Sequence, residues 1–158
     1  MTCEGRSDFR IVPLLAGPFN DCVETGSLPR YRPDIARMVE ALRQTEAETE
    51  EPVFYIISGD LAHIGPEFDD PNLLDKPFLT LSRRQDDQLC RAMEAMDMDR
   101  YFRIIADEAN SRRICGLPPT YTLLEAIQPW RGKILHYDQY VHPRGLQSVS
   151  FASVGFYR

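Results

Sequence analysis

Val53-Phe54-Tyr55-Ile56-Ile57-Ser58-Gly59-Asp60-Leu61-Ala62-His63 is the stretch that decides the fold. Val53 to Ile57 form an uninterrupted apolar run, which is typical of a strand buried on both faces. Ser58 and Gly59 end the run, and the titratable side chains of Asp60 and His63 follow. Ligands of open α/β sheets bind beyond the carboxyl ends of the strands, so this pair predicts part of a site. The alternative is a turn in which Asp60 is a cap and His63 is a hydrogen-bonded wall residue.

The segments around this stretch predict an α/β fold. Residues 9–15 predict an earlier strand, and an amphipathic helix beginning at Pro33 separates it from the strand at 53–57. A strand, a helix and a strand in this order pair in parallel. Further helices are predicted with Ser82 and Asp99 as caps and with Pro118-Pro119 in a first turn, before two strands at 133–141 and 148–157. We therefore expect one domain over residues 1–158, with a parallel-rich sheet flanked by helices.

The composition is ordinary for a globular protein: of 158 residues, 43% are hydrophobic and 27% are charged. The 18 basic residues are outnumbered by 24 acidic residues and form only short clusters, which argues against nucleic acid or a membrane surface as a partner. No segment approaches the roughly 20 apolar residues of a membrane span, and the N-terminus lacks the pattern of a signal peptide. Four cysteines without a Cys-x-x-Cys pair predict free thiols, so we expect a cytoplasmic protein.

Cys115 is the second candidate for chemistry. It lies in Ile114-Cys115-Gly116-Leu117-Pro118-Pro119, directly before a predicted helix whose N-terminus carries partial positive charge. That charge favours a thiolate, which is the form that ligates metals or attacks electrophiles. The alternative is a small buried cysteine that packs behind the helix start. The two other histidines, His136 in a predicted strand and His142 in a predicted turn, are expected to be structural.

Several common catalytic patterns do not occur in the chain. It has no Gly-x-Ser-x-Gly elbow, no glycine-rich phosphate loop, no dinucleotide-binding fingerprint and no His-Glu-x-x-His. Ser58, Asp60 and His63 contain the residue types of a hydrolase triad, but they lie too close together in sequence for its geometry.

Four separated motifs together resemble one family. They are Phe9-Arg10-Ile11-Val12-Pro13-Leu14-Leu15, the segment from Ser58 to Phe68, Cys115-Gly116-Leu117-Pro118-Pro119 and Ser148-Val149-Ser150-Phe151-Ala152. In this order they resemble the Memo-like family, whose bacterial members are called AmmeMemoRadiSam system protein B. The resemblance implies the α/β fold of class III extradiol dioxygenases, with a pocket of histidines, an aspartate and a cysteine that has been linked to iron or copper.

The resemblance also implies roles for single residues. By motif, Asp60 and His63 line the pocket as catalytic groups that orient or protonate a substrate, and Cys115 and His63 are the metal-ligand candidates. Family members are longer at the N-terminus, where two pocket histidines and the first strands lie, so the chain resembles the C-terminal part of the fold. We therefore expect an incomplete site for iron or copper in this chain.

Three functions follow from this resemblance. The first is a non-heme dioxygenase-type enzyme, and catalysis by this chain alone is the least expected of the three. The second is a non-catalytic protein that binds a peptide or a small molecule in the same cleft. The third is a fragment completed by a partner chain that supplies the N-terminal part. A sheet without its first strands exposes an unpaired edge, which favours a homo-oligomer or pairing with that partner.

Overall fold

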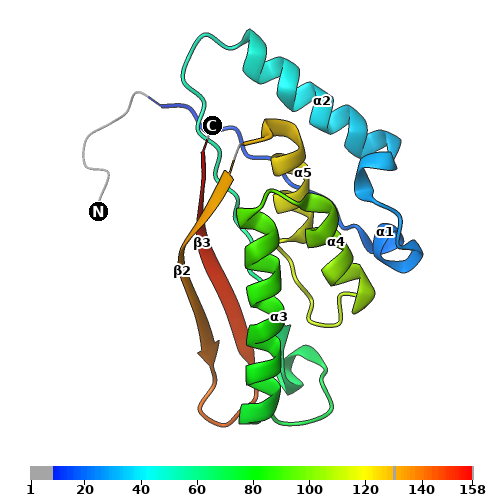
Figure 1. Cartoon of the computed structure of the whole chain (residues 1–158), viewed down its shortest axis with the longest axis vertical. Coiled ribbons are helices and arrows are strands. Elements are labelled where there is room, and N and C mark those ends of the chain that lie inside the picture. The colour runs from blue at the N-terminus through cyan, green and yellow to red at the C-terminus, as the bar shows by residue number, and fades with distance from the viewer. Residues whose placement is uncertain (1–8, 130, 158) are drawn as a thin grey trace.

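The computed structural model describes residues 9–129 and 131–157 and shows a mixed α/β fold (Figure 1). The helices are α1 (Asn20–Thr25), α2 (Pro33–Glu48), α3 (Lys76–Glu94), α4 (Met98–Asp107) and α5 (Leu117–Ile127). The strands are β1 (His63–Ile64), β2 (Arg131–Val141) and β3 (Ser148–Tyr157), and short 3₁₀ turns lie at Pro29–Tyr31 and Pro66–Phe68. Within this part of the chain, no helix is both long enough and apolar enough to cross a membrane.

The sheet has three antiparallel strands in the order β1-β3-β2. β2 and β3 form a long hairpin in which Arg131 pairs with Tyr157 at one end and Val141 pairs with Ser148 at the other. β1 contributes only two residues, and its His63 pairs with Val149 on the other edge of β3. The hairpin thereby fixes the backbone of His63 next to one end of β3.

The helices enclose the core on one side of this hairpin, with α3 lying along it (Figure 1). Leu89 and Met93 of α3 are buried, together with Phe102 of α4 and Tyr121 of α5. The rings of Phe102 and Tyr121 meet edge to face, with 6.1 Å between their centroids. These helices therefore form one hydrophobic core, and α5 extends from it toward the segment that holds Cys115.

The expected parallel-rich sheet is not what the described residues form. Residues 9–15 and 53–57 are extended, but neither segment belongs to a strand ladder, and the strands that do pair are antiparallel. Most of their apolar side chains are exposed, at 78% for Val12 and 86% for Phe54, although Ile57 is partly buried against the core. A parallel strand buried on both faces needs covering layers and neighbouring strands, and these two segments have apolar residues without that cover.

The predicted helices and the hairpin are confirmed, with corrections at the helix starts. α3 begins at Lys76, where Asp75 caps it by accepting a hydrogen bond from the Phe78 N–H, and Ser82 is a buried residue inside the helix. Asp97 caps α4 in place of Asp99, which lies in its first turn. A capping side chain must reach a free backbone N–H in the first turn of the helix. Residue type alone does not tell which of several nearby polar residues does so.

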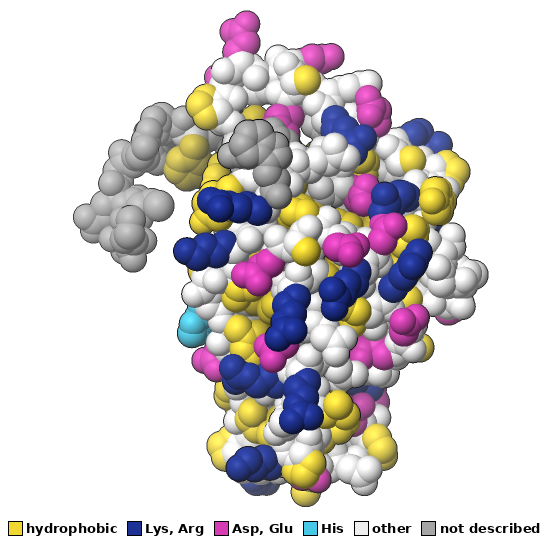
Figure 2. All heavy atoms as spheres, viewed as in Figure 1, with side chains coloured by type: hydrophobic (Ala, Val, Ile, Leu, Met, Phe, Trp, Pro, Cys, Tyr) yellow, Lys and Arg dark blue, Asp and Glu magenta, His cyan; other side chains and the backbone are white. Residues whose placement is uncertain are grey.

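Positive and negative side chains are mixed on the face of the molecule on which α3 lies (Figure 2). Lys and Arg side chains alternate there with Asp and Glu, and no stripe of a single sign runs over this face.

Candidate metal site

Asp60, His63 and Cys115 come together in the structure. One donor atom from each residue lies within 4.8 Å of the donor atoms of the other two, and no other group of this kind occurs among the described residues. Asp60 follows the extended segment 53–57, His63 belongs to β1, and Cys115 lies two residues before α5. The structure therefore joins the two candidate sites of the sequence into one.

Two glycines allow the loops that carry these side chains to touch. The Gly116 N–H donates to the Asp60 carbonyl at 3.0 Å, and the Asp60 N–H donates to the Cys115 sulfur at 3.2 Å. A Cβ on Gly59 would lie 2.6 Å from the Gly116 Cα, and a Cβ on Gly116 would lie 2.7 Å from the Asp60 oxygen. Backbone contact at this distance is what brings the thiol beside Asp60.

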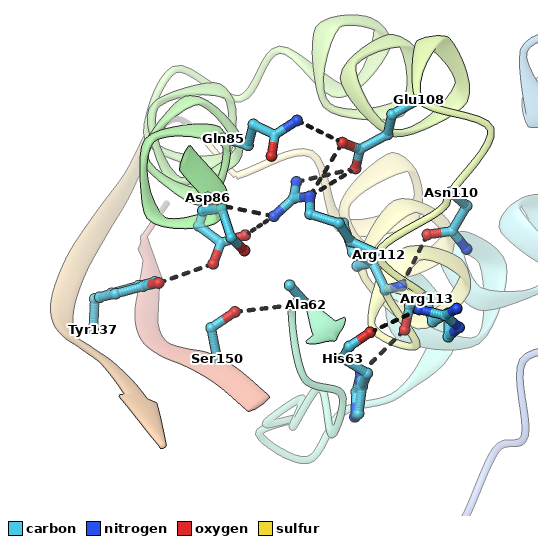
Figure 3. Close-up of polar contacts among 12 residues, drawn as sticks. Ala62, His63, Gln85, Asp86, Glu108, Asn110, Arg112, Arg113, Tyr137 and Ser150 are labelled. Atoms are coloured by element: carbon cyan, nitrogen blue, oxygen red, sulfur yellow. Dashed lines mark hydrogen bonds and ion pairs between the residues drawn. The ribbon is translucent and has the colours of Figure 1, made fainter. Parts of the chain in front are cut away.

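His63 is held by the segment that leads to Cys115 (Figure 3). Its backbone N–H donates to the Arg112 carbonyl at 2.7 Å, and its Nδ1 lies 3.0 Å from the Arg113 carbonyl. Its Nε2 faces Asp60, 3.7 Å from Oδ2, and the ring of Phe68 meets the imidazole edge to face. One ring nitrogen therefore contacts the backbone, while the other lies on the side of Asp60 and Cys115.

β3 fixes the backbone between Asp60 and His63. Ser150, which is fully buried, accepts a hydrogen bond from the Ala62 N–H at its hydroxyl and donates its own N–H to the Ala62 carbonyl (Figure 3). The Leu61 N–H donates to the Ser150 carbonyl at 2.9 Å. These contacts give the terminal Ser148-to-Ala152 motif a physical role, because it secures the segment that presents Asp60 and His63.

A buried ion-pair network anchors the other loop (Figure 3). Arg112 is 4% exposed and pairs with Asp86 of α3 and with Glu108 at the end of α4, and Asp86 also accepts a hydrogen bond from Tyr137 of β2 at 2.9 Å. Burial lowers the pKa of Arg112, but hydrogen bonds and charges from Glu108 and Asp86 outweigh this effect and raise it. Burial raises the pKa of Tyr137, and Asp86 raises it further. The network therefore consists of a cation, two carboxylates and a neutral phenol.

The three side chains are open to solvent to different degrees. Cys115 is exposed, while the side chains of Asp60 and His63 are 49% and 18% exposed. A cavity of about 430 Å³ adjoins Cys115 and is lined mainly by apolar side chains of α1, of α5 and of the loops before them, together with Asn20, Asn110 and Arg113. The thiol is therefore accessible from a hollow large enough for a small organic ligand.

The other histidines and cysteines described by the structure lie outside this group. His136 is exposed on β2, and the Nδ1 of His142 accepts a hydrogen bond from the Arg144 N–H within the hairpin turn. Cys90 is buried on α3 and Cys22 is buried on α1. Cys3 lies outside the described residues.

Sequence reasoning missed the residues that support the site. Arg112 and Arg113 are visible in the sequence only as a basic pair, and Asp70 only as part of an acidic loop. Nothing in the local sequence tells that Arg112 is buried while its neighbour Arg113 is partly exposed. The available signal was the Arg-Arg pair placed two residues before the candidate cysteine.

Comparison with protein families places the chain. A family model for Memo-like proteins matches residues 6–155. The chain belongs to the Memo-like family. No individually curated protein matched the chain. The family match covers both loops of the candidate site, so Asp60, His63 and Cys115 all lie within the Memo-like domain.

Proposed function

We propose that this Memo-like protein binds a transition-metal ion, iron or copper, through His63 and Cys115, with the Asp60 carboxylate beside them. The observation that carries the proposal is the 4.8 Å limit within which the three donor atoms lie. Metal–nitrogen and metal–sulfur bonds of about 2.0–2.3 Å place donors on one ion within about 4 Å of each other. Small side-chain rotations therefore suffice to close the group around an ion.

The donor chemistry of the site fits such an ion. Imidazole and thiolate ligands suit copper, zinc and iron, whereas magnesium and calcium prefer oxygen ligands. The Nδ1 of His63 is engaged by a backbone carbonyl, as is usual for histidines that bind metal through the other nitrogen. The Asp60 N–H donates to the Cys115 sulfur and compensates part of the charge that a thiolate carries.

The same geometry supports a dioxygenase-type pocket. A transition metal held by His63 and Cys115 would supply Lewis-acid chemistry toward an oxygen-containing ligand. The Asp60 carboxylate is half-exposed beside His63 and Cys115. It is therefore placed to exchange a proton with a ligand bound at these two residues. The hollow beside Cys115 offers an organic ligand room next to the ion.

The site has fewer imidazoles than a complete oxygenase centre. Non-heme iron oxygenases commonly hold iron with two histidines and one carboxylate, whereas His63 is the one histidine of this group. We therefore propose that the chain alone binds metal weakly and does not cleave catechol rings, and that further ligands come from another polypeptide.

Isothermal titration tests the metal site. Anaerobic Fe(II), Cu(II) and Zn(II) are titrated into the purified chain, into Cys115→Ser and into His63→Gln, with His136→Gln as a matched control because His136 is exposed on β2. We expect weak one-to-one binding that both site variants abolish and that His136→Gln leaves intact. Tight stoichiometric binding that survives both site substitutions would place the metal elsewhere in the chain.

A second candidate function, binding to another polypeptide, has an observation of its own. The segments 9–15 and 53–57, which we call the apolar strip, both carry exposed apolar side chains: Leu15 is 100% exposed, Phe54 86% and Ile56 80%. The Arg10 guanidinium pairs with Glu51 at 2.7 Å, so the two segments begin close to each other. Exposed apolar patches of this kind mark interaction sites, and extended segments accept an added strand. We propose that this apolar strip associates with the same strip of a second copy.

A further inference from the structure

We infer that Asp70 and Arg113 form a positioning clamp, which fixes the tautomer and orientation of His63 so that its Nε2 faces Asp60 and Cys115. The inference rests on the proposed metal-binding function, because orientation of Nε2 is what a metal requires of this histidine. Neither residue belongs to the group of donor atoms. Both act on it through the two segments that carry the ligands.

The clamp joins the segment 63–70 to the segment 111–115. Arg113 Nη2 pairs with Asp70 Oδ1 at 3.0 Å, and Nη1 donates to the carbonyls of Ser111 at 3.0 Å and His63 at 3.3 Å. The second carboxylate oxygen of Asp70 accepts the Gly65 N–H at 2.7 Å. One guanidinium therefore connects both segments through three acceptors, which its planar fork of donors makes possible.

The carbonyl of Arg113 determines which ring nitrogen of His63 carries the proton. A carbonyl oxygen can only accept, so the 3.0 Å contact with Nδ1 requires the proton to be on Nδ1. Nε2 then carries a lone pair, and its 3.7 Å separation from Asp60 Oδ2 is too long for a hydrogen bond. The lone pair is therefore available to an ion beside Cys115, as in metal sites whose histidines are oriented by their other nitrogen.

The backbone of Arg113 depends on these contacts. Arg113 has a positive φ of 53°, in the left-handed region that residues with a side chain rarely adopt. Such conformations persist where the surrounding contacts over-determine them. Loss of the ion pair with Asp70 leaves the guanidinium with the two carbonyl acceptors of Ser111 and His63, and this weaker attachment allows the Arg113 carbonyl to turn away from Nδ1.

If the ion pair between Asp70 and Arg113 only stabilised the fold, breaking it would lower stability, whereas a role in orienting His63 predicts a change at His63 itself. The side chains of Arg113 and Asp70 are 37% and 21% exposed, so their ion pair is partly solvated and contributes little to folding. The effect of breaking it should therefore be found at His63 and in metal affinity, with the unfolding transition nearly unchanged.

The experiment compares Asp70→Asn with Asp69→Asn. Both variants remove one negative charge from the same loop, and Asp69 has a positive φ of 66°, which asparagine adopts readily. Long-range ¹⁵N–¹H NMR of the metal-free protein at pH 8.5, where imidazoles are ordinarily neutral, reports which ring nitrogen of His63 carries the proton. Titration with Zn(II) and thermal unfolding are measured on the same samples.

We expect wild type and Asp69→Asn to show His63 protonated on Nδ1, and Asp70→Asn to show a mixture of tautomers with about tenfold weaker zinc binding. An unchanged Nδ1 proton and unchanged affinity in Asp70→Asn would overturn the clamp. If Asp70→Asn does not fold, Arg113→Lys decides, because one ammonium cannot reach all three acceptors: altered tautomers support the clamp and unaltered ones overturn it. Wild type that binds none of Fe(II), Cu(II) and Zn(II) but has its proton on Nδ1 would refute the proposed function and leave the clamp intact.

Discussion

Gly116 has an ordinary backbone conformation, with φ −70° and ψ −10°, so its need for a glycine comes from space. An added Cβ would lie 2.7 Å from the Asp60 carbonyl oxygen and 3.3 Å from the Gly59 carbonyl carbon. Both neighbours are backbone atoms, which cannot move aside as the end of a flexible side chain can. The contact between Gly59 and Gly116 therefore sets the separation of Asp60 from Cys115.

We predict that Gly116→Ala separates the two loops, destabilises the protein by about 1–3 kcal/mol and weakens metal binding, since overpacking forces backbone shifts. Urea unfolding and zinc titration measure the two effects. Gly17→Ala is the matched control, because a Cβ there meets nothing within 4 Å. Equal stability and equal zinc affinity in both variants would show that the loop contact does not determine the site.

The three candidate ligands could be predicted from the sequence, and their supporting residues could not. Asp60 and His63 follow an apolar run, and Cys115 precedes a helix with prolines in its first turn, so each carries a local signal. Asp70 and Arg113 act through a contact between residues 43 positions apart. Such a contact depends on how the loops fold back on each other, which composition and spacing do not encode.

At the scale of elements, α3 connects the hairpin to the site. Its Asp86 is fully buried and contacts both Tyr137 of β2 and Arg112 of the loop before Cys115. Arg112 in turn presents its carbonyl to the His63 N–H. Asp86 and Arg112 therefore form a continuous line of contacts from α3 to the backbone of a candidate ligand.

We predict that Asp86→Asn destabilises the protein by about 3 kcal/mol, because removal of one partner leaves part of a buried charge uncompensated. Glu108 still pairs with Arg112, so the variant should fold and its loss can be measured by chemical unfolding. Asp87→Asn, at the neighbouring exposed position, should change stability by less than about 0.5 kcal/mol. A loss of similar size in both variants would mean that net charge, and not the buried network, is responsible.

Helices and the terminal hairpin were predictable because their signals are local. The period of apolar residues and the prolines of the first turns locate α2 and α5, and alternation with a turn locates β2 and β3. The segments 9–15 and 53–57 have equally clear apolar runs, yet neither forms a strand among the described residues. A strand requires a partner, and whether a partner is present is not a property of the run itself.

At the scale of the whole molecule, the two segments of the apolar strip lead to the candidate metal site. The segment 53–57 continues through Ser58 and Gly59 to Asp60, and Ala16 and Pro18, directly after the segment 9–15, line the cavity beside Cys115. A polypeptide that covers the strip would thus lie next to the candidate ligands. The proposed association and the proposed completion of the site would therefore take place next to each other.

We predict that the chain self-associates through the apolar strip, because each copy presents the same apolar, extended segments and identical surfaces can pair about a twofold axis. Sedimentation velocity over a range of concentrations measures the association. Phe54→Lys with Ile56→Lys should produce a monomer, since charged edge residues prevent strand addition. Leu73→Lys with Leu135→Lys changes the charge equally at two other exposed apolar residues, 62% and 56% exposed, and should leave the association intact. A monomeric wild type at every soluble concentration, or equal disruption by both pairs, would refute self-association through the strip.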